Sequence, residues 1–213
     1  MTQRQGMQRI IISYLIILLI PTLCNLISVT RSYTNLVMTI CDLVGAGWLL
    51  YLSLHIKEKA PLEQHPTSHI KIIQWGIIGA FCCVLFQLLI VFIEHDCFHS
   101  IQASLNTNML ITGIKSLPLM ALAVLIAAPI MEEIVFRKII FGDLCQFTNK
   151  WLAALIASVL FALTHADGHL LVYTIIGMIF CYLYQKTGSV YTSMIAHILM
   201  NTFIVISYLW TIH

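Results

Sequence analysis

Two adjacent glutamates stand inside an apolar stretch, where ionisable side chains are costly and usually functional. They are Glu132 and Glu133, and Arg137 follows four residues after the second. Neighbouring residues of a helix point about 100° apart, so the two carboxylates cannot share a face. Glu133 and Arg137 have the spacing and order that favour an ion pair. We therefore expect Arg137 to neutralise Glu133, while Glu132 faces elsewhere as a carboxylate able to accept a proton from water. The alternative is that both acids only hold helices together.

Two further polar pairs repeat the spacing of four residues. Phe161 and His165 share one helix face, as do His197 and Asn201. Imidazole and amide groups both carry N–H donors, and such donors stabilise the oxyanion formed when water attacks a carbonyl. A single membrane histidine commonly makes an interhelical hydrogen bond, but three polar sites together indicate a functional cavity.

The depths expected for these side chains agree. Glu132 and His165 lie on either side of a connection near 143–150, so in an antiparallel hairpin they reach similar depths, about 15–21 Å from its cytoplasmic end. His197 follows the next cytoplasmic turn and is expected at about 12 Å. The sequence thus predicts one cavity, open to the cytoplasmic side, that collects Glu132, His165, His197 and Asn201.

Zinc is the alternative chemistry, because one Glu and two His match a three-ligand catalytic site with an open fourth position. Its ligands would be Glu132, His165 and His197. The sequence has no H-E-x-x-H, which would have favoured zinc, so we expect no cofactor. His165, Asp167 and His169 could form a second metal cluster, although a turn at 167–168 and an interfacial His169 are the preferred interpretation.

The amino-acid composition indicates what kind of structural element holds these residues in place. Of 213 residues, 60% are hydrophobic and 9% are charged, against about 25% charged in soluble domains. A net charge of +2 excludes an electrostatic nucleic-acid binder. The sequence predicts an all-α polytopic membrane bundle. Its expected partners are the lipid bilayer and a peptide or protein substrate, and no nucleic acid is expected. The oligomeric state stays open.

About seven spans are expected, since a spanning helix needs about 20 apolar residues. They cover 10–29, 35–55, 72–93, 119–141, 151–166, 169–186 and 190–211, and part of 94–118 could add an eighth. The first is interpreted as a retained signal anchor. Nine Lys and Arg residues fall on one set of connections and two on the other, which places the N-terminus in the cytoplasm and the C-terminus outside.

Other reactive residues carry weaker signals. The seven cysteines are odd in number and mostly lie in apolar runs, so we interpret them as small buried hydrophobes. Asp143 and Asp167 fall at helix ends and are expected to be solvated. Asp42 lies inside the second span; it could be a relay or a substrate contact, but a packing contact to another helix is the preferred interpretation.

The three motifs together resemble one known family. Glu132-Glu133-x-x-x-Arg137, Phe161-x-x-x-His165 and His197-x-x-x-Asn201 are similar to the motifs of the CPBP (Abi) family, which includes type II CAAX prenyl proteases and bacterial proteins linked to bacteriocin processing and self-immunity. The resemblance covers residues 118–205, which we expect to form a catalytic core. This core is part of a single transmembrane domain over 1–213. Residues 1–117 add membrane spans but no motif.

The resemblance implies intramembrane hydrolysis of a peptide bond by a glutamate-activated water without metal. Glu132 would be the general base, and His165 would orient and polarise the water. His197 and Asn201 would stabilise the oxyanion. Glu133, Arg137 and Phe161 would support the site structurally.

Two other classes of function compete with a peptidase. A non-enzymatic membrane protein with a role in immunity or regulation could keep this fold. A protein that had lost protease activity would, however, be expected to lose a motif residue, and none is lost. A transporter would more often show inverted repeats, which are not evident. The expected protein is an intramembrane endopeptidase of a bacterial plasma membrane, acting on a membrane-presented peptide or protein tail, with bacteriocin maturation or self-immunity as candidate roles.

Overall fold

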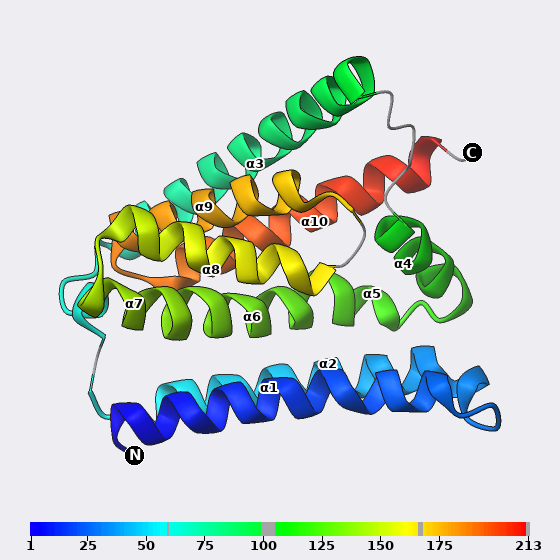
Figure 1. Cartoon of the computed structure of the whole chain (residues 1–213), viewed down its shortest axis with the longest axis horizontal. Helices are drawn as coiled ribbons and strands as arrows, with labels where there is room; N and C mark the ends of the chain where they lie inside the picture. The colour runs from blue at the N-terminus through cyan, green and yellow to red at the C-terminus, as the bar shows by residue number, and fades with distance from the viewer. Residues whose placement is uncertain (59, 99–104, 166–167, 212–213) are drawn as a thin grey trace. The chain divides into compact units, whose positions relative to one another are not determined.

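Every regular element is helical in the part of the chain that the computed structural model describes, residues 1–58, 60–98, 105–165 and 168–211. Figure 1 shows these helices in chain order. Their bounds are α1 (Gln3–Leu26), α2 (Thr34–Leu54), α3 (His69–Phe98), α4 (Leu105–Ser116), α5 (Met120–Leu122), α6 (Ala128–Glu132), α7 (Gly142–Phe147), α8 (Lys150–His165), α9 (Leu170–Thr187) and α10 (Val190–Thr211). Two 3-10 turns, η1 (Arg31–Tyr33) and η2 (Pro61–Glu63), and two π-helical segments, η3 (Ala123–Ala127) and η4 (Glu133–Phe141), complete the set. The predicted all-α class is confirmed.

Five helices of the described residues are long and apolar enough to cross a bilayer, namely α1, α2, α3, α9 and α10. They correspond to five of the seven predicted spans. The predicted span over 151–166 corresponds to α8, which is apolar but has only 16 residues. A polytopic helical membrane bundle is therefore confirmed, while the total of seven spans stays a prediction.

The segment expected as one regular span over 119–141 is divided in the structure. The π-helical segment η3 ends directly before α6, which contains Pro129. Proline has no N–H to donate, and its ring clashes with the carbonyl four residues earlier, so the α-helical pattern is interrupted there. A second π-helical segment, η4, begins at Glu133. π-Helical turns are rare and occur frequently at functional sites.

The chain folds into two compact units, of which the first contains Met1–Lys59 and Leu110–Val135. Here α2 packs against α1 and also contacts α5, η3 and α6. Gly45 permits the close approach, because a Cβ atom there would lie 2.7 Å from Ile17 Cδ1 and 2.9 Å from Met131 Sδ. Small residues bring helix backbones together in this way in membrane bundles.

The second unit contains Ala60–Met109 and Phe136–His213. α3 packs against α9 and α10, while α8 packs against α9 and contacts α7. Buried residues of α3, α9 and α10 form one apolar cluster: Cys83, Ile90, Val172, Ile176, Phe180, Leu183, Ala196 and Met200. No disulfide joins the cysteines whose side chains the structure describes.

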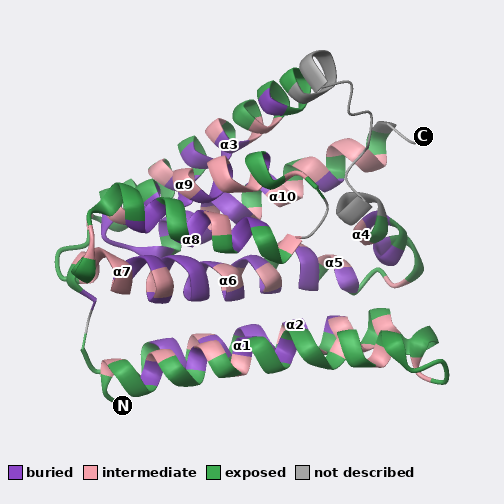
Figure 2. Ribbon diagram, in the orientation of Figure 1, coloured by how far each residue is buried: buried purple, intermediate pink, exposed green. Residues whose placement is uncertain are grey.

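Large apolar residues remain exposed on the long helices, and Figure 2 shows many exposed positions along α1 and α3. On α1 they include Ile12, Leu15, Ile16 and Leu19, and on α3 Leu85, Leu88, Leu89 and Phe92. A soluble protein rarely exposes apolar patches of this extent. These faces are therefore suited to contact lipid tails.

Substituting Gly177 tests the tight contact between α8 and α9. A Cβ atom at this position would lie 2.8 Å from Ser158 Cβ and 3.0 Å from its Cα, so Gly177→Ala must push the helices apart. We expect a loss of about 1–3 kcal/mol, as for other overpacked sites. Gly47→Ala is the matched control, because nothing lies within 4 Å of a Cβ atom there. Thermal unfolding in one detergent compares the two; equal melting temperatures would contradict the close contact.

Candidate active site

In the second unit, Phe161 lies at the centre of a group of motif residues. Its side chain is 1% exposed, and the guanidinium carbon of Arg137 lies 4.3 Å from its ring centroid. The Phe161 ring also meets His165 and His197 edge-on, with centroid distances of 4.7 Å and 5.9 Å. One aromatic ring therefore contacts residues from all three motifs.

Arg137 is fully buried, at 0% exposure. Its guanidinium lies against Phe161 and also over Phe180, 5.0 Å from that ring centroid. Aromatic faces attract cations, and the attraction is stronger where water is excluded. A planar guanidinium can also stack on rings in a way that a lysine ammonium cannot. The two phenylalanines thus fix the position of the arginine.

His165 ends α8, and its ring is held on two sides. Nδ1 donates a hydrogen bond of 3.0 Å to the Phe161 carbonyl, since a carbonyl oxygen can only accept. The ring stacks on Tyr173 at a centroid distance of 3.9 Å. In the neutral imidazole this tautomer leaves Nε2 with a lone pair. That nitrogen can accept a proton from a water molecule or ligate a metal.

His197 is nearly fully buried on α10, at 2% exposure. It stacks on Phe180 with a centroid distance of 4.7 Å and meets the edge of Phe161. The same two phenylalanines therefore contact both Arg137 and His197. Asn201, one helical turn further along α10, is half-buried. The face predicted for His197 and Asn201 thus carries one buried and one half-buried polar side chain.

The sequence motifs did not predict that Tyr173 would contact His165 or that Phe180 would contact His197. Tyr173 and Phe180 both belong to α9, which carries no polar motif, and nothing in their side chains suggests chemistry. They are seven residues apart and so share one face of the helix. This aromatic spacing is the signal that could have identified the face of α9 that meets the two histidines.

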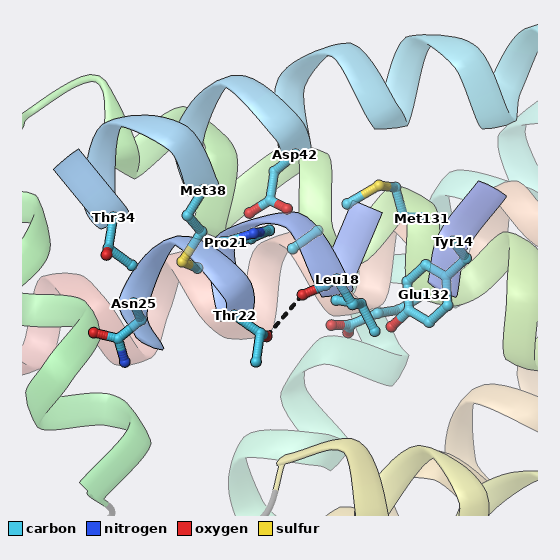
Figure 3. A pocket seen from close by; sticks show the side chains of 11 residues that line it. Tyr14, Leu18, Pro21, Thr22, Asn25, Thr34, Met38, Asp42, Met131 and Glu132 are labelled. Carbon is cyan, nitrogen blue, oxygen red and sulfur yellow. Dashed lines mark hydrogen bonds between the residues drawn. The ribbon is translucent and has the colours of Figure 1, made fainter. Parts of the chain in front are cut away.

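The first unit contains both motif glutamates. Glu133 is fully buried, at 0% exposure. Glu132 is half-buried and lines a cavity of about 360 Å³. Figure 3 shows this cavity with Glu132, Tyr14 and Asp42 among its lining side chains. A carboxylate at the edge of a mostly apolar cavity can take a proton from a water molecule held there.

The structure thus brings Arg137, Phe161, His165 and His197 together in one unit and places Glu132 and Glu133 in the other. The ion pair between Glu133 and Arg137 and the shared cavity of Glu132 with the histidines stay predictions. The alternative cluster of His165, Asp167 and His169 includes Asp167, which lies outside the described residues.

The fold and these contacts define a class: a polytopic helical membrane protein with buried Arg, His and Glu side chains in its motif-bearing helices. A family model described as type II CAAX prenyl endopeptidase Rce1-like matches residues 114–203. This range coincides closely with the predicted core over 118–205.

Three curated bacterial proteins are similar to this chain. MroQ of Staphylococcus aureus, named a membrane-embedded CAAX protease, is 33% identical over 174 residues, 77% of this chain and 70% of MroQ. YdiL of Bacillus subtilis, described as a membrane peptidase, is 44% identical over 135 residues, 63% of this chain and 55% of YdiL. YxdF of Lactococcus lactis is 42% identical over 80 residues, 37% of this chain and 44% of YxdF. The comparison with solved structures gives no significant match.

The chain belongs to the Rce1-like family of type II CAAX prenyl endopeptidases. The resemblance noted from the three motifs is therefore confirmed. The apolar helices and the bacterial relatives identify a membrane protein of bacterial type. The matched regions span just over half of YdiL and about two thirds of MroQ.

Proposed function

We propose that this protein is an intramembrane endopeptidase that hydrolyses a peptide bond with a water molecule activated by Glu132. Family membership supports a peptidase. The observation that carries the proposal is the Phe161-centred group, in which Arg137, His165 and His197 from three separate motifs contact one ring. Residues kept together in this way suit a single reaction better than three independent structural roles.

The proposed reaction assigns one role to each polar side chain. Glu132 takes a proton from the water as its oxygen attacks the scissile carbonyl carbon, and later returns it to the leaving amine. His165 accepts a hydrogen bond from that water at Nε2, because its Nδ1 is held by the Phe161 carbonyl. His197 and Asn201 donate N–H groups to the oxyanion. Glu133, Arg137 and Phe161 hold these groups in place.

The proposed substrate is a peptide or protein tail presented at the membrane. The names of the family model and of MroQ refer to CAAX substrates, in which a prenylated cysteine precedes the residues removed. Bacteriocin maturation and self-immunity are further roles within this proposal. A farnesylated C-terminal peptide and its unprenylated counterpart, compared in vesicles containing the protein, show whether a lipid anchor is required.

The proposal is tested by mapping new peptide termini in membranes. Cells expressing the wild-type protein are compared with cells expressing equal amounts of the Glu132→Gln variant, and N-terminal peptides are identified by mass spectrometry. We expect termini that occur only with the wild-type protein. Identical sets of termini, together with an unchanged cellular phenotype, would favour the non-enzymatic alternative.

Metal content decides between the two chemistries for activating water. We expect the protein purified in detergent to contain well below about one zinc per chain and to keep its activity after chelation. Zinc analysis by mass spectrometry and cleavage assays before and after chelation provide the measurement. A stoichiometric zinc that leaves together with activity, and that is missing from His165→Ala and His197→Ala, would instead make Glu132, His165 and His197 its ligands.

A further inference from the structure

Asp42 is a buried acidic residue to which the proposed reaction assigns no role. It lies on α2, is 5% exposed and lines the cavity of the first unit. Figure 3 shows its carboxyl group among the side chains around this cavity. No described residue forms a hydrogen bond or an ion pair with this carboxyl group. Because a buried polar group without a partner costs free energy, the position of Asp42 points to a bound ligand that supplies the partner.

The cavity follows one face of α1 and one face of α2. Thr34, Met38 and Asp42 are spaced by four residues on α2, and Leu18 and Thr22 have the same spacing on α1. From α6 the lining residues are Ala128, Met131 and Glu132. The cavity volume of about 360 Å³ falls within the range of ligand pockets, about 300–1,000 Å³. It therefore has room for a substrate side chain together with the backbone that carries it.

The polar groups of the lining are suited to accept hydrogen bonds. Thr22 donates its hydroxyl proton to the Leu18 carbonyl over 2.8 Å, and Thr34 donates its own to the Arg31 carbonyl over 2.9 Å. A hydroxyl group that donates keeps lone pairs with which it can accept. Asp42 adds its carboxyl oxygens, and none of the described residues that line the cavity is Lys, Arg or His. A ligand group with several N–H donors therefore fits this lining.

The groups near Asp42 leave its carboxyl oxygens available to a ligand. Glu132 and Tyr14, the other ionisable residues of the lining, take part in interactions of their own. Arg31 lies about three helical turns from Asp42 along the chain, and its Nε donates to the Asn25 carbonyl over 3.0 Å. Asp42 is thus the acidic residue of the described lining whose hydrogen-bonding capacity is unused.

We propose that the cavity is a subsite for a basic side chain of the substrate, with Asp42 as the residue that binds its ammonium or guanidinium group. Hydrogen bonds between a carboxylate and such a cation are shorter and stronger than those between neutral groups. Because Glu132 lines the same cavity, the basic residue of the substrate lies close to the scissile bond. This inference rests on the proposed function and adds a substrate class to it. No covalent step involves Asp42.

Terminus mapping provides the first test. The peptides produced only with the wild-type protein are aligned at the cleavage site, and the frequency of Lys and Arg at each position is compared with that in the membrane proteome. We expect a basic residue within about three residues of the cleaved bond, because an extended chain advances about 3.3 Å per residue. Basic residues at background frequency would overturn the inference and leave the peptidase activity established.

Synthetic peptides measure what Asp42 contributes. A mapped substrate is made with lysine, glutamine or norleucine at the basic position; norleucine resembles lysine without its ammonium group. We expect the wild-type protein to prefer the lysine peptide over the norleucine peptide by about 10- to 100-fold in kcat/KM, the range for a hydrogen bond to a charged group. The glutamine peptide should lie between them. Asp42→Asn should bring the ratio close to one, and Glu58→Gln, at an exposed position, should keep it.

Binding gives a readout that does not depend on the chemical step. Fluorescent lysine and norleucine peptides are titrated onto the full-length Glu132→Gln variant in vesicles of phosphatidylethanolamine and phosphatidylglycerol. We expect the lysine peptide to bind about 10- to 100-fold more tightly, and the preference to disappear when Asp42→Asn is added. If Asp42→Asn does not fold, Asp42→Glu replaces it: the longer acid should shift the preference from lysine to the shorter ornithine.

The outcomes separate the inference from the proposed function on which it rests. If folded Glu132→Gln protein still cleaves the mapped peptide, the proposed function fails. If Glu132→Gln is inactive, any of three results overturns the inference alone. These are equal cleavage of the lysine and norleucine peptides by the wild-type protein, a glutamine peptide cleaved as well as the lysine peptide, or a lysine preference that Asp42→Asn leaves unchanged.

Discussion

Glu132→Gln is expected to abolish peptide cleavage while leaving the protein folded. Glutamine preserves the size and much of the hydrogen bonding of the side chain, but it cannot take a proton from water. Loss of general-base catalysis typically lowers the rate by about 10²–10⁴-fold. Glu132 is half-buried at a cavity, so the substitution should disturb little packing. Cleavage of the mapped peptide in vesicles, with thermal unfolding of the same preparation, measures both quantities.

The other proposed catalytic residues give a graded series. His165→Ala and His197→Ala should resemble Glu132→Gln, whereas Asn201→Ala should be milder, about 10²–10³-fold, as for one lost oxyanion donor. Glu58→Gln should retain full activity because its side chain is exposed on a connection. Wild-type cleavage by folded Glu132→Gln protein would show that Glu132 is not the base.

Glu133→Gln is expected to act on stability rather than on the chemical step. Glu133 and Arg137 are both fully buried, and their spacing predicts an ion pair. Removing one partner of a buried pair typically costs about 3–5 kcal/mol, because the remaining charge loses its compensation. We expect a lower yield and melting temperature, with activity reduced in proportion to the folded protein. Specific activity per folded molecule is the deciding measurement.

A double-mutant cycle tests whether Arg137 is the partner. Arg137→Gln removes the other charge, and the double variant Glu133→Gln with Arg137→Gln leaves neither charge uncompensated. Coupled residues give a double variant that is less destabilised than the sum of the single changes. Arg137→Gln alone also loses the contacts with Phe161 and Phe180. Additive effects would mean that Glu133 and Arg137 do not form a pair.

The sequence was sufficient to predict the class of the protein and its family. A chain with 60% hydrophobic and 9% charged residues has too few polar groups to cover a soluble surface. Apolar runs of about 20 residues specify helices because the backbone must satisfy its own hydrogen bonds in lipid. Three motifs with spacings of four residues indicated the family because helical periodicity places such pairs on one face.

The local helix geometry near Glu133 and the surroundings of Asp42 could not be predicted from the sequence. The spacing of Glu133 and Arg137 implied a regular helix, but the structure is π-helical from Glu133 to Phe141. Pro129 was visible in the sequence, yet a proline can kink, end or locally widen a helix, and the packing around it selects the outcome. For Asp42, the choice between a packing contact and a relay or substrate contact stays a prediction; the structure shows that this residue is 5% exposed and lines the same cavity as Glu132.

Helical periodicity by itself determined which residues share a face of one helix, and hence that His165 and His197 belong to polar faces. Only the tertiary structure decided which faces meet. Phe161 and Phe180 both contact Arg137 and His197, and Asp42 shares a cavity with a glutamate that lies far away in the sequence. The physical reason is that periodicity is a property of one helix, whereas contacts between helices depend on close packing at small residues such as Gly45 and Gly177.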